Sequence, residues 1–179
     1  MHHPVVNKDG EVIASAVTNL DLHDLARIGC TYGVPRLYVV TPLTDQQALV
    51  ERILAHWVSG FGGDYNPRRR TAMARVRVCE RVETAVAAVA RREGDPPRIV
   101  ATSAQGGPGR IGFRRLRGML ADGRPTMLVF GTAWGLAETL LAEADHVLAP
   151  IEGADGYNHL PVRAAAAIVL DRLLGGTPS

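Results

Sequence analysis

Short apolar runs rich in β-branched residues alternate with helical patterns along most of this chain, and this alternation limits the possible folds more than any other feature. A strand, a helix and a second strand in succession form a βαβ unit with parallel strands. The sequence therefore predicts an α/β fold with a mostly parallel sheet and helices on both faces. We expect strands at residues 12–17, 37–41, 75–79, 98–102, 126–130 and 146–149, and helices at residues 22–32, 45–60, 81–92, 112–121, 136–144 and 161–174.

The length of 179 residues fits one domain, which we expect at residues 1–175, followed by a flexible tail at residues 176–179. No apolar run approaches the roughly 20 residues of a membrane helix, so no membrane partner is expected. The first residues lack the layout of a secretory signal. Cys30 and Cys79 lack CxxC spacing and are interpreted as free thiols in a reducing cytosol, with no metal site, which predicts a cytoplasmic protein.

The net charge is only +2, but the positive charge is gathered in two arginine clusters. A guanidinium pairs with phosphate through two hydrogen bonds, so such clusters are typical of surfaces that bind an RNA or DNA backbone. A solvated surface is an equally good interpretation of either cluster taken alone. The first cluster contains Arg68, Arg69, Arg70, Arg75 and Arg77, and the second contains Arg110, Arg114, Arg115 and Arg117.

The loops that follow the last apolar runs carry glycine and small side chains. Because the carboxyl ends of parallel strands share one edge of a sheet, we expect these loops to converge on a ligand-binding crevice. Gly131 and Gly135 leave the main chain of one loop accessible, although a plain turn with Trp134 in the core is the alternative. In the next loop, Ile151 and Leu160 can sandwich a flat apolar ring, with the amides of residues 157–160 at its edge. The loop at residues 104–109 can close over the ligand.

Several common site motifs are missing from the sequence. It has no GxGxxG fingerprint and no P-loop, which disfavours NAD and ATP in their usual modes and argues against a Rossmann-type oxidoreductase. It has no HExxH motif and no Cys/His metal spacing. Asn19, Asp21, His23, Asp24 and Arg27 gather at the first helix start, where Asp21 is expected to be the N-cap. They suit either general-base chemistry or a surface ion-pair network. Residues 60–67 are expected to form a flexible loop.

Together these segments resemble the SPOUT superfamily of S-adenosylmethionine-dependent RNA methyltransferases, the α/β trefoil-knot proteins. LVFGTAWGL resembles the family segment LVFGxExxGL, and APIEG followed by YNHLPVRAAAAIVLDRL resembles IPM…SLNVSVAAAI. LARIGCTYGVPRLYVV resembles the segment RxxxxFGVxxxxLV and places Arg27 on the family's arginine. The resemblance covers nearly the whole chain.

One subgroup resembles this chain more closely, namely the domain found alone or fused to the bacterial tRNA (guanine-N1)-methyltransferase. Its hallmarks are HHPV, NKDGEV, AVTNLDLHD, a YNP loop, VATSA, GPGRI, FGTxWGL and YNHLSVRxAAAI. In this sequence they are found at residues 2–5, 7–12, 16–24, 65–67, 100–104, 107–111, 130–136 and 157–168.

The resemblance implies a homodimer and a C-terminal trefoil knot, in which the chain after about Leu148 passes through a loop, contrary to the usual rule of unknotted chains. It implies S-adenosylmethionine as cofactor, with contacts at Thr102, Ser103, Phe130, Gly131, Trp134, Gly135, Pro150, Ile151, Gly153, Asn158, His159 and Leu160. It implies catalytic roles for Arg27 and for Asp21, with Asp24 as another candidate base. RNA contacts are expected at Arg68, Arg69, Arg70, Arg110 and Arg114.

Three positions depart from the family pattern. Asp21 replaces an asparagine of the ribose methyltransferases, Ala133 replaces their glutamate, and Pro161 replaces a serine. The first two changes weaken an assignment to ribose 2′-O-methylation and leave a ring nitrogen as the other acceptor, and the third removes a hydroxyl group and an N–H donor. The resemblance implies methylation of tRNA or rRNA, and the alternative is a non-catalytic module that binds S-adenosylmethionine or RNA and assists another modification enzyme. We also expect relatives to carry a few apolar residues before HHPV that complete the first strand.

Overall fold

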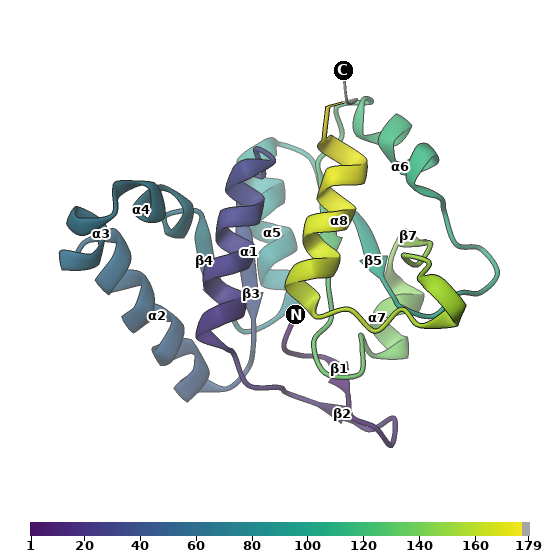
Figure 1. Ribbon diagram of the computed structural model, residues 1–179, viewed down its shortest axis with the longest axis horizontal. Coiled ribbons are helices and arrows are strands. Elements are labelled where there is room, and N and C mark those ends of the chain that lie inside the picture. The colour runs from purple at the N-terminus through teal and green to yellow at the C-terminus, as the bar shows by residue number, and fades with distance from the viewer. Residues whose placement is uncertain (177–179) are drawn as a thin grey trace.

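The computed structural model describes residues 1–176, and its parallel strands form two sheets (Figure 1). In the smaller sheet β3 (Leu37–Val40) pairs with β4 (Val76–Cys79), and in the larger β5 (Arg98–Thr102) lies between β6 (Thr126–Val129) and β7 (His146–Leu148). A short antiparallel hairpin joins β1 (Val5–Val6) and β2 (Val12–Ile13). The predicted α/β class with parallel strands is confirmed, but the strands form two parallel sheets and a hairpin.

Helices cover the strands from both sides. In Figure 1, α1 and α8 run side by side in front, and α5 lies behind the strands and contacts β3 and β4. Three further helices, here called the α2–α4 lobe, extend to the left in the same view. The helices are α1 (Asn19–Thr31), α2 (Thr44–Val58), α3 (Phe61–Tyr65), α4 (Pro67–Met73), α5 (Val82–Glu93), α6 (Phe113–Leu120), α7 (Glu138–Glu143) and α8 (Val162–Leu174), with a 3-10 turn at Ala154–Gly156.

Two local predictions near the helix starts are wrong. The N-cap of α1 is Thr18, whose side chain accepts a hydrogen bond from the Asp21 amide at 3.1 Å, so Asp21 lies in the first turn. Residues 60–67 form α3 and the start of α4 because Gly62 and Gly63 let α3 pack closely on α2. A Cβ at Gly63 would lie 2.6 Å from the Trp57 carbonyl oxygen. The strand expected at 12–17 is limited to β2, and β1 was not predicted.

The first residues connect the two parallel sheets. The His2 amide donates to the Val40 carbonyl at the end of β3 (2.9 Å), and the Met1 amino group donates to the Phe130 carbonyl after β6 (2.7 Å). Burial lowers the pKa of this amino group to about 6. Further along, Val6 exchanges main-chain hydrogen bonds with Trp134 and Gly135. The N-terminal segment therefore fixes the loop that follows β6.

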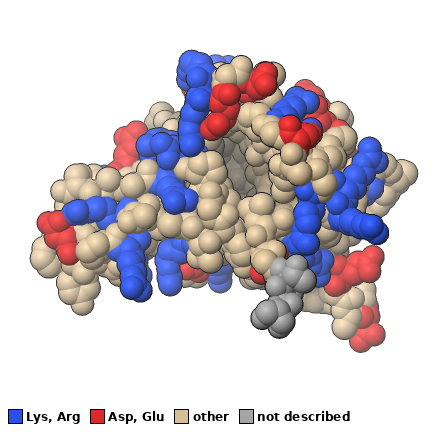
Figure 2. Space-filling view, turned by 90° about the horizontal axis from the view of Figure 1, so that it is seen from above, with Lys and Arg blue, Asp and Glu red and all other residues tan. Residues whose placement is uncertain are grey.

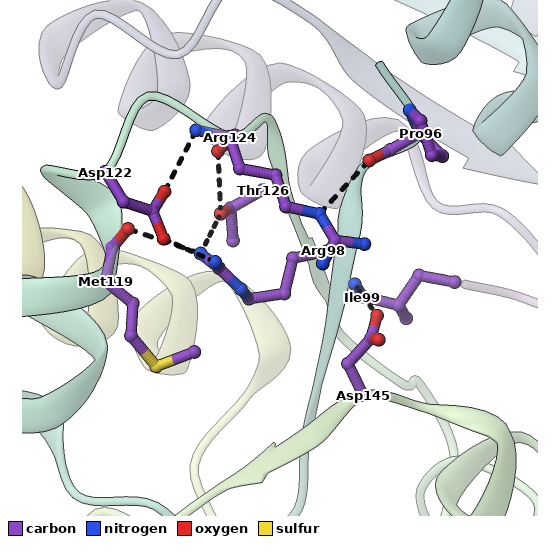
Figure 3. A network of polar contacts seen from close by, with 8 residues as sticks. All are labelled: Pro96, Arg98, Ile99, Met119, Asp122, Arg124, Thr126 and Asp145. Atoms are coloured by element: carbon purple, nitrogen blue, oxygen red, sulfur yellow. Dashed lines mark hydrogen bonds and ion pairs between the residues drawn. The ribbon is translucent and has the colours of Figure 1, made fainter.

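A buried arginine at the opposite edge of the larger sheet is fully paired (Figure 3). Arg98 is 7% exposed, forms an ion pair with Asp122 and donates to the Met119 carbonyl. The hydrogen bond from Arg98 lowers the pKa of the Asp122 carboxyl group. Asp145 accepts from the Ile99 amide at 2.7 Å. These contacts join the start of β5 to the residues that precede β6 and β7. They therefore fix the amino ends of the three strands relative to one another.

The core is divided among three clusters. The first joins the α2–α4 lobe to α1 and the β3–β4 sheet around Val50, Met73 and Val76, and the other two lie against β5. Both cysteines are free. Within residues 1–176, no helix combines the length and apolar character that crossing a membrane requires. The tail expected at 176–179 lies outside the described residues from 177 onward.

Candidate functional site

The loops after β5, β6 and β7 meet at one edge of the larger sheet, as expected for parallel neighbours. We call residues 102–109, 130–137 and 149–161 the crevice loops. The Thr102 hydroxyl group donates to the Val129 carbonyl at 3.0 Å, and the Asn158 side chain donates to the Ala104 carbonyl. The Ala149 amide donates to the Ile111 carbonyl at 2.8 Å. The structure thus brings the predicted segments together.

The crevice loop after β6 depends on bare backbone. A Cβ at Gly131 would lie 2.7 Å from the Leu136 nitrogen, because the loop folds back on itself. Ala133 has φ 53° and Gly135 has φ 117°, both in the left-handed region. Trp134 is 69% exposed, so the alternative interpretation of this residue as core packing is wrong.

The crevice loop after β7 is even tighter. A Cβ at Gly153 would lie 1.7 Å from the Tyr157 carbonyl oxygen, so only glycine permits this closure. The Tyr157 amide donates to the Ala154 carbonyl and the Leu160 amide donates to the Asn158 carbonyl. Two of the amides predicted to meet a ligand are therefore engaged within the loop, and the His159 amide has no acceptor among residues 1–176.

The crevice loops offer mostly main-chain groups and apolar side chains, with Glu152 and Asp155 as their exposed acidic residues. Within the described part of the chain, the amides of Gly131 and Ile151 also have no acceptor. Phe130 and Ile151 are half-buried and Leu160 is 41% exposed. The Phe130 carbonyl is engaged by Met1, so it is the side chain of Phe130 that remains for a ligand. This donor set fits a ligand with a flat ring and a polar edge.

Outside the crevice loops, the described part of the chain contains two cavities but no cluster of metal-binding side chains. Among residues 1–176, no three His, Cys, Asp or Glu side chains gather as metal ligands. Two cavities of about 270 and 240 Å³ lie beside α5 and α7. The first is lined mostly by apolar side chains, including Val86 and Ile99, whereas the second is lined also by His3, Arg81 and Glu83, and neither is lined by the crevice loops.

A polar chain supports the crevice loop after β6 from behind. His2 Nδ1 lies 3.0 Å from the Ser15 hydroxyl, which lies 2.6 Å from the Thr132 hydroxyl. Thr132 in turn donates to the Met1 carbonyl at 3.0 Å. Burial, followed by the positive charge of the Met1 amino group, lowers the pKa of His2 to about 4. His2 is therefore neutral at pH 7 and acts as a hydrogen-bonding support.

The two predicted catalytic residues lie on α1 in different environments. The Asp21 side chain is 14% exposed and accepts from the Thr18 hydroxyl at 2.6 Å and from Arg163 at 3.1 Å. The Arg27 side chain is 61% exposed, and its one ion-pair contact among residues 1–176 is with Asp24 at 4.0 Å. Arg27 is therefore free to meet a ligand, whereas Asp21 is held in an ion-pair network.

Arg163 contacts the candidate site and was not among the residues predicted from the sequence. It lies in α8, directly after the crevice loop that follows β7, and contacts both Asp21 and Asp24 on α1. Its partners are more than a hundred residues away, so no local pattern announces the contact. The signal available was its place in the YNHLPVR segment. Through Arg163, the crevice loop and the α1 start are coupled.

The first arginine cluster divides into free and engaged side chains. Arg68 is exposed, and Arg69 lies over the Trp57 ring at 4.6 Å. Neither forms an ion pair within residues 1–176, whereas Arg70 pairs with Asp64. The remaining two, Arg75 and Arg77, donate to main-chain carbonyls. Arg68 is therefore the exposed guanidinium group of this cluster without an ion pair, and Arg69 lies half-buried against the Trp57 ring.

The second cluster lies on and before α6. Arg114 is exposed, Arg110 is half-buried, and Arg117 donates to the Arg172 carbonyl. Figure 2 shows basic side chains on both sides of the upper face, toward the α2–α4 lobe at the left and toward α6 at the right, with a hollow between them. The basic side chains on this face therefore do not form one continuous patch.

Sequence comparisons point to one family. The family described as "SAM-dependent RNA methyltransferase" matches residues 1–175. A protein of Oleidesulfovibrio alaskensis named "tRNA (guanine-N(1)-)-methyltransferase" is 47% identical over 98% of this chain, but the match covers 41% of that relative. An uncharacterized protein of Aquifex aeolicus is 34% identical over 97% of this chain and 85% of its own length. The chain thus spans less than half of the named relative.

Structural comparisons agree on the fold. A probable methyltransferase from Bordetella pertussis has a TM-score of 0.61 at 19% identity, covering 86% of each chain. A TrmH/SpoU tRNA modifying enzyme from A. aeolicus has a TM-score of 0.55 at 17% identity, covering 89% of this chain and 70% of the other. At these identities the likeness concerns the fold alone.

Proposed function

This chain belongs to the SAM-dependent RNA methyltransferase family, and from this premise we propose that it transfers a methyl group from S-adenosylmethionine, bound among the crevice loops, to tRNA or rRNA. The single observation that carries the proposal is the convergence of the loops after β5, β6 and β7, whose free amides and half-buried apolar side chains suit this cofactor. The SPOUT resemblance is confirmed at the level of family and fold.

The proposed cofactor contacts divide by chemistry. The side chains of Phe130, Ile151 and Leu160 would pack on the adenine ring, and the amides of Gly131, Ile151 and His159 would bond its polar groups. Tight loops with glycine at the turns support this assignment, since they leave the main chain accessible. The full proposed set is Thr102, Ser103, Phe130, Gly131, Trp134, Gly135, Pro150, Ile151, Gly153, Asn158, His159 and Leu160.

The chain's own task in methyl transfer is to align the acceptor and to direct one proton. The cofactor supplies a methyl group that its sulfonium already activates. Arg27, exposed near the ion-pair network, would hold a phosphate or orient the nucleophile. Asp21 would accept the proton, with Arg163 holding its carboxylate in place. Asp24 contacts the same arginine and is the second candidate base.

RNA binding is proposed for the free arginines of both clusters. Arg68 and Arg69 lie without ion pairs on the α2–α4 lobe, and Arg110 and Arg114 lie beside α6. Arg70, paired with Asp64, would support the lobe and contribute less to phosphate binding. Exposed guanidinium groups on both sides of the molecule suit an RNA that extends past a single patch (Figure 2).

Assembly and topology extend the proposal. Exposed leucines at the start of α1, before α8 and at its end support a homodimer through the α1 and α8 face; these are Leu20, Leu160 and Leu174. Sedimentation velocity with Leu20→Glu tests this, and a wild-type monomer would contradict it.

A trefoil knot after Leu148 and a cytoplasmic location stay predictions. Mechanical stretching from both ends tests the knot, since residues trapped in it shorten the extended chain.

The direct test of function is transfer of a labelled methyl group to RNA from cells that lack the chain. Incorporation is expected with the wild-type protein and is expected to fall with Arg27→Ala. Labelled nucleosides released by digestion would identify a base nitrogen or the ribose 2′-oxygen. A folded wild-type protein that labels no RNA fraction would contradict the proposal.

The second candidate is a non-catalytic module that binds the cofactor or RNA and assists another enzyme. It is favoured by the 41% coverage of the curated relative, since that protein's named activity can lie in the part beyond the match. Cofactor binding without transfer to any RNA, together with transfer once the part of that relative beyond the match is supplied in trans, would support this candidate.

A further inference from the structure

A pair of aromatic rings stands unpartnered at the tip of the α2–α4 lobe. Phe61 is 75% exposed and Tyr65 is 79% exposed, and their rings stack with centroids 6.2 Å apart and planes 22° apart. They occupy the first and fifth positions of α3, so they share one face of a single helical turn. Large exposed rings gathered on one turn mark an interaction surface.

The sequence of α3 forces this exposure. Between the two rings, Gly62 and Gly63 are buried against α2, where a Cβ at Gly62 would lie 2.6 Å from His56 Nε2. The inner face of the turn is therefore filled by backbone, and the rings at its ends point outward. Trp57 of the lobe packs edge-on against His23 of α1 and lies against the core cluster that joins the lobe to α1. The ring pair thus sits on a firm support.

The charges around the ring pair select the kind of partner. Arg68 and Arg69 follow Tyr65 within the next turn of chain, and neither has an ion-pair partner among residues 1–176. Asp64 is the one acidic residue of α3 and α4, and Arg70 neutralises it. An apolar stacking surface beside unpaired guanidinium groups is complementary to a base and its phosphate.

We propose that the α3–α4 tip binds unpaired nucleotides of the RNA substrate, with the rings of Phe61 and Tyr65 stacking on bases and the guanidinium groups of Arg68 and Arg69 binding phosphates. The inference rests on the proposed function, since it names how that substrate docks. The tip lies at the far end of the molecule from the crevice loops (Figure 1). It therefore anchors the RNA at a distance from the methylated nucleoside.

The test compares two RNA probes, a hairpin with an unpaired loop and a blunt duplex of the same stem, by fluorescence anisotropy. Phe61→Ala/Tyr65→Ala is expected to weaken hairpin binding by about 10- to 100-fold and to leave duplex binding nearly unchanged. The ring-preserving swap Phe61→Tyr/Tyr65→Phe is expected to bind the hairpin like wild type. Both rings are exposed, so the thermal midpoint and the cofactor affinity should not change.

Arginine variants separate phosphate binding from stacking. Arg68→Ala is expected to weaken the binding of both probes and to reduce the magnitude of the slope of log K against log salt by about 0.7. Arg91→Ala removes the same charge from an exposed position on α5 and is expected to change neither probe. An unchanged slope for Arg68→Ala would contradict the phosphate contact.

Three outcomes would overturn the inference. The double alanine variant could bind the hairpin as tightly as wild type, or the wild-type protein could bind neither probe. The variant could also alter the oligomeric state in sedimentation while keeping its hairpin affinity, which would make the ring pair a subunit contact. Methyl transfer is read separately. If the wild-type protein transfers methyl groups but the double alanine variant keeps its hairpin affinity, only the proposed docking site is refuted. If hairpin affinity depends on the rings but no methyl group is transferred, only the proposed catalytic function is refuted.

Discussion

Arg27 and Arg163 both lie beside Asp24, yet their side chains are held in very different ways. Arg163 is two-thirds buried and pairs with Asp21 and Asp24, whereas Arg27 is mostly exposed and makes one long contact. A side chain that keeps other charges in place contributes to stability, and an exposed one is free for a ligand. Alanine variants should therefore separate positioning from direct contact.

Arg27→Ala is expected to change the free energy of unfolding by less than about 0.5 kcal/mol and to slow methyl transfer at least about 100-fold. Arg163→Ala is expected to lower the free energy of unfolding by about 1–2 kcal/mol, because Asp21 keeps a nearly buried charge without its partner. Urea denaturation and transfer rates, measured on both variants, check this. Full-rate transfer by Arg27→Ala would remove that residue from the mechanism.

His2 makes stability depend on pH. Its pKa is about 4 in the folded protein and about 6.5 when unfolded, so the unfolded chain binds more protons between these values. The stabilisation is complete above about pH 6.5 and is lost as the pH falls through about 4, a change of about 3 kcal/mol. His2→Asn should flatten this part of the urea-denaturation profile. An identical pH dependence in both proteins would show that His2 does not titrate as a buried group.

Among the elements, the crevice loops depend most on glycine. Gly153→Ala is expected to weaken cofactor binding at least about 10-fold, because the added methyl group would meet the Tyr157 carbonyl and open the turn. Gly106→Ala, in the crevice loop after β5, meets no atom within 4 Å and is expected to bind within about 2-fold of wild type. Calorimetric titration of both variants is the measurement. Equal affinities would mean that the tight turn does not form the binding surface.

The sequence predicted the elements that repeat a local pattern. The strand at β5 was placed at its observed bounds, and every helix except α3 and α4 was placed within a few residues, because apolar periodicity reports burial. Residues 60–67, which contain α3 and the start of α4, were taken for a loop, because glycine lowers local helix propensity and packing on α2 explains α3. The rest of α4 was not predicted. The N-cap of α1 was misplaced because both Thr18 and Asp21 are residue types that can cap a helix. The hydrogen bonds between these two residues place Thr18 at the cap and Asp21 in the first turn.

At the scale of the whole molecule, the site joins distant parts of the chain. Met1 and His2 bond to the ends of β6 and β3, and Arg163 joins α8 to α1. The crevice itself could be predicted, because parallel strands place their carboxyl ends together. The ion pairs of Arg163 and the hydrogen-bonded side chains that link His2 to Thr132 could not be predicted, because each depends on a contact across more than a hundred residues.

The measurement that tests the account most directly is calorimetric titration of the wild-type protein with S-adenosylmethionine, with NAD as the control ligand. The crevice predicts binding in the micromolar range at about one molecule per subunit and no heat with NAD. A folded protein that binds neither ligand, or that binds NAD equally well, would contradict a cofactor site built from the loops after β5, β6 and β7.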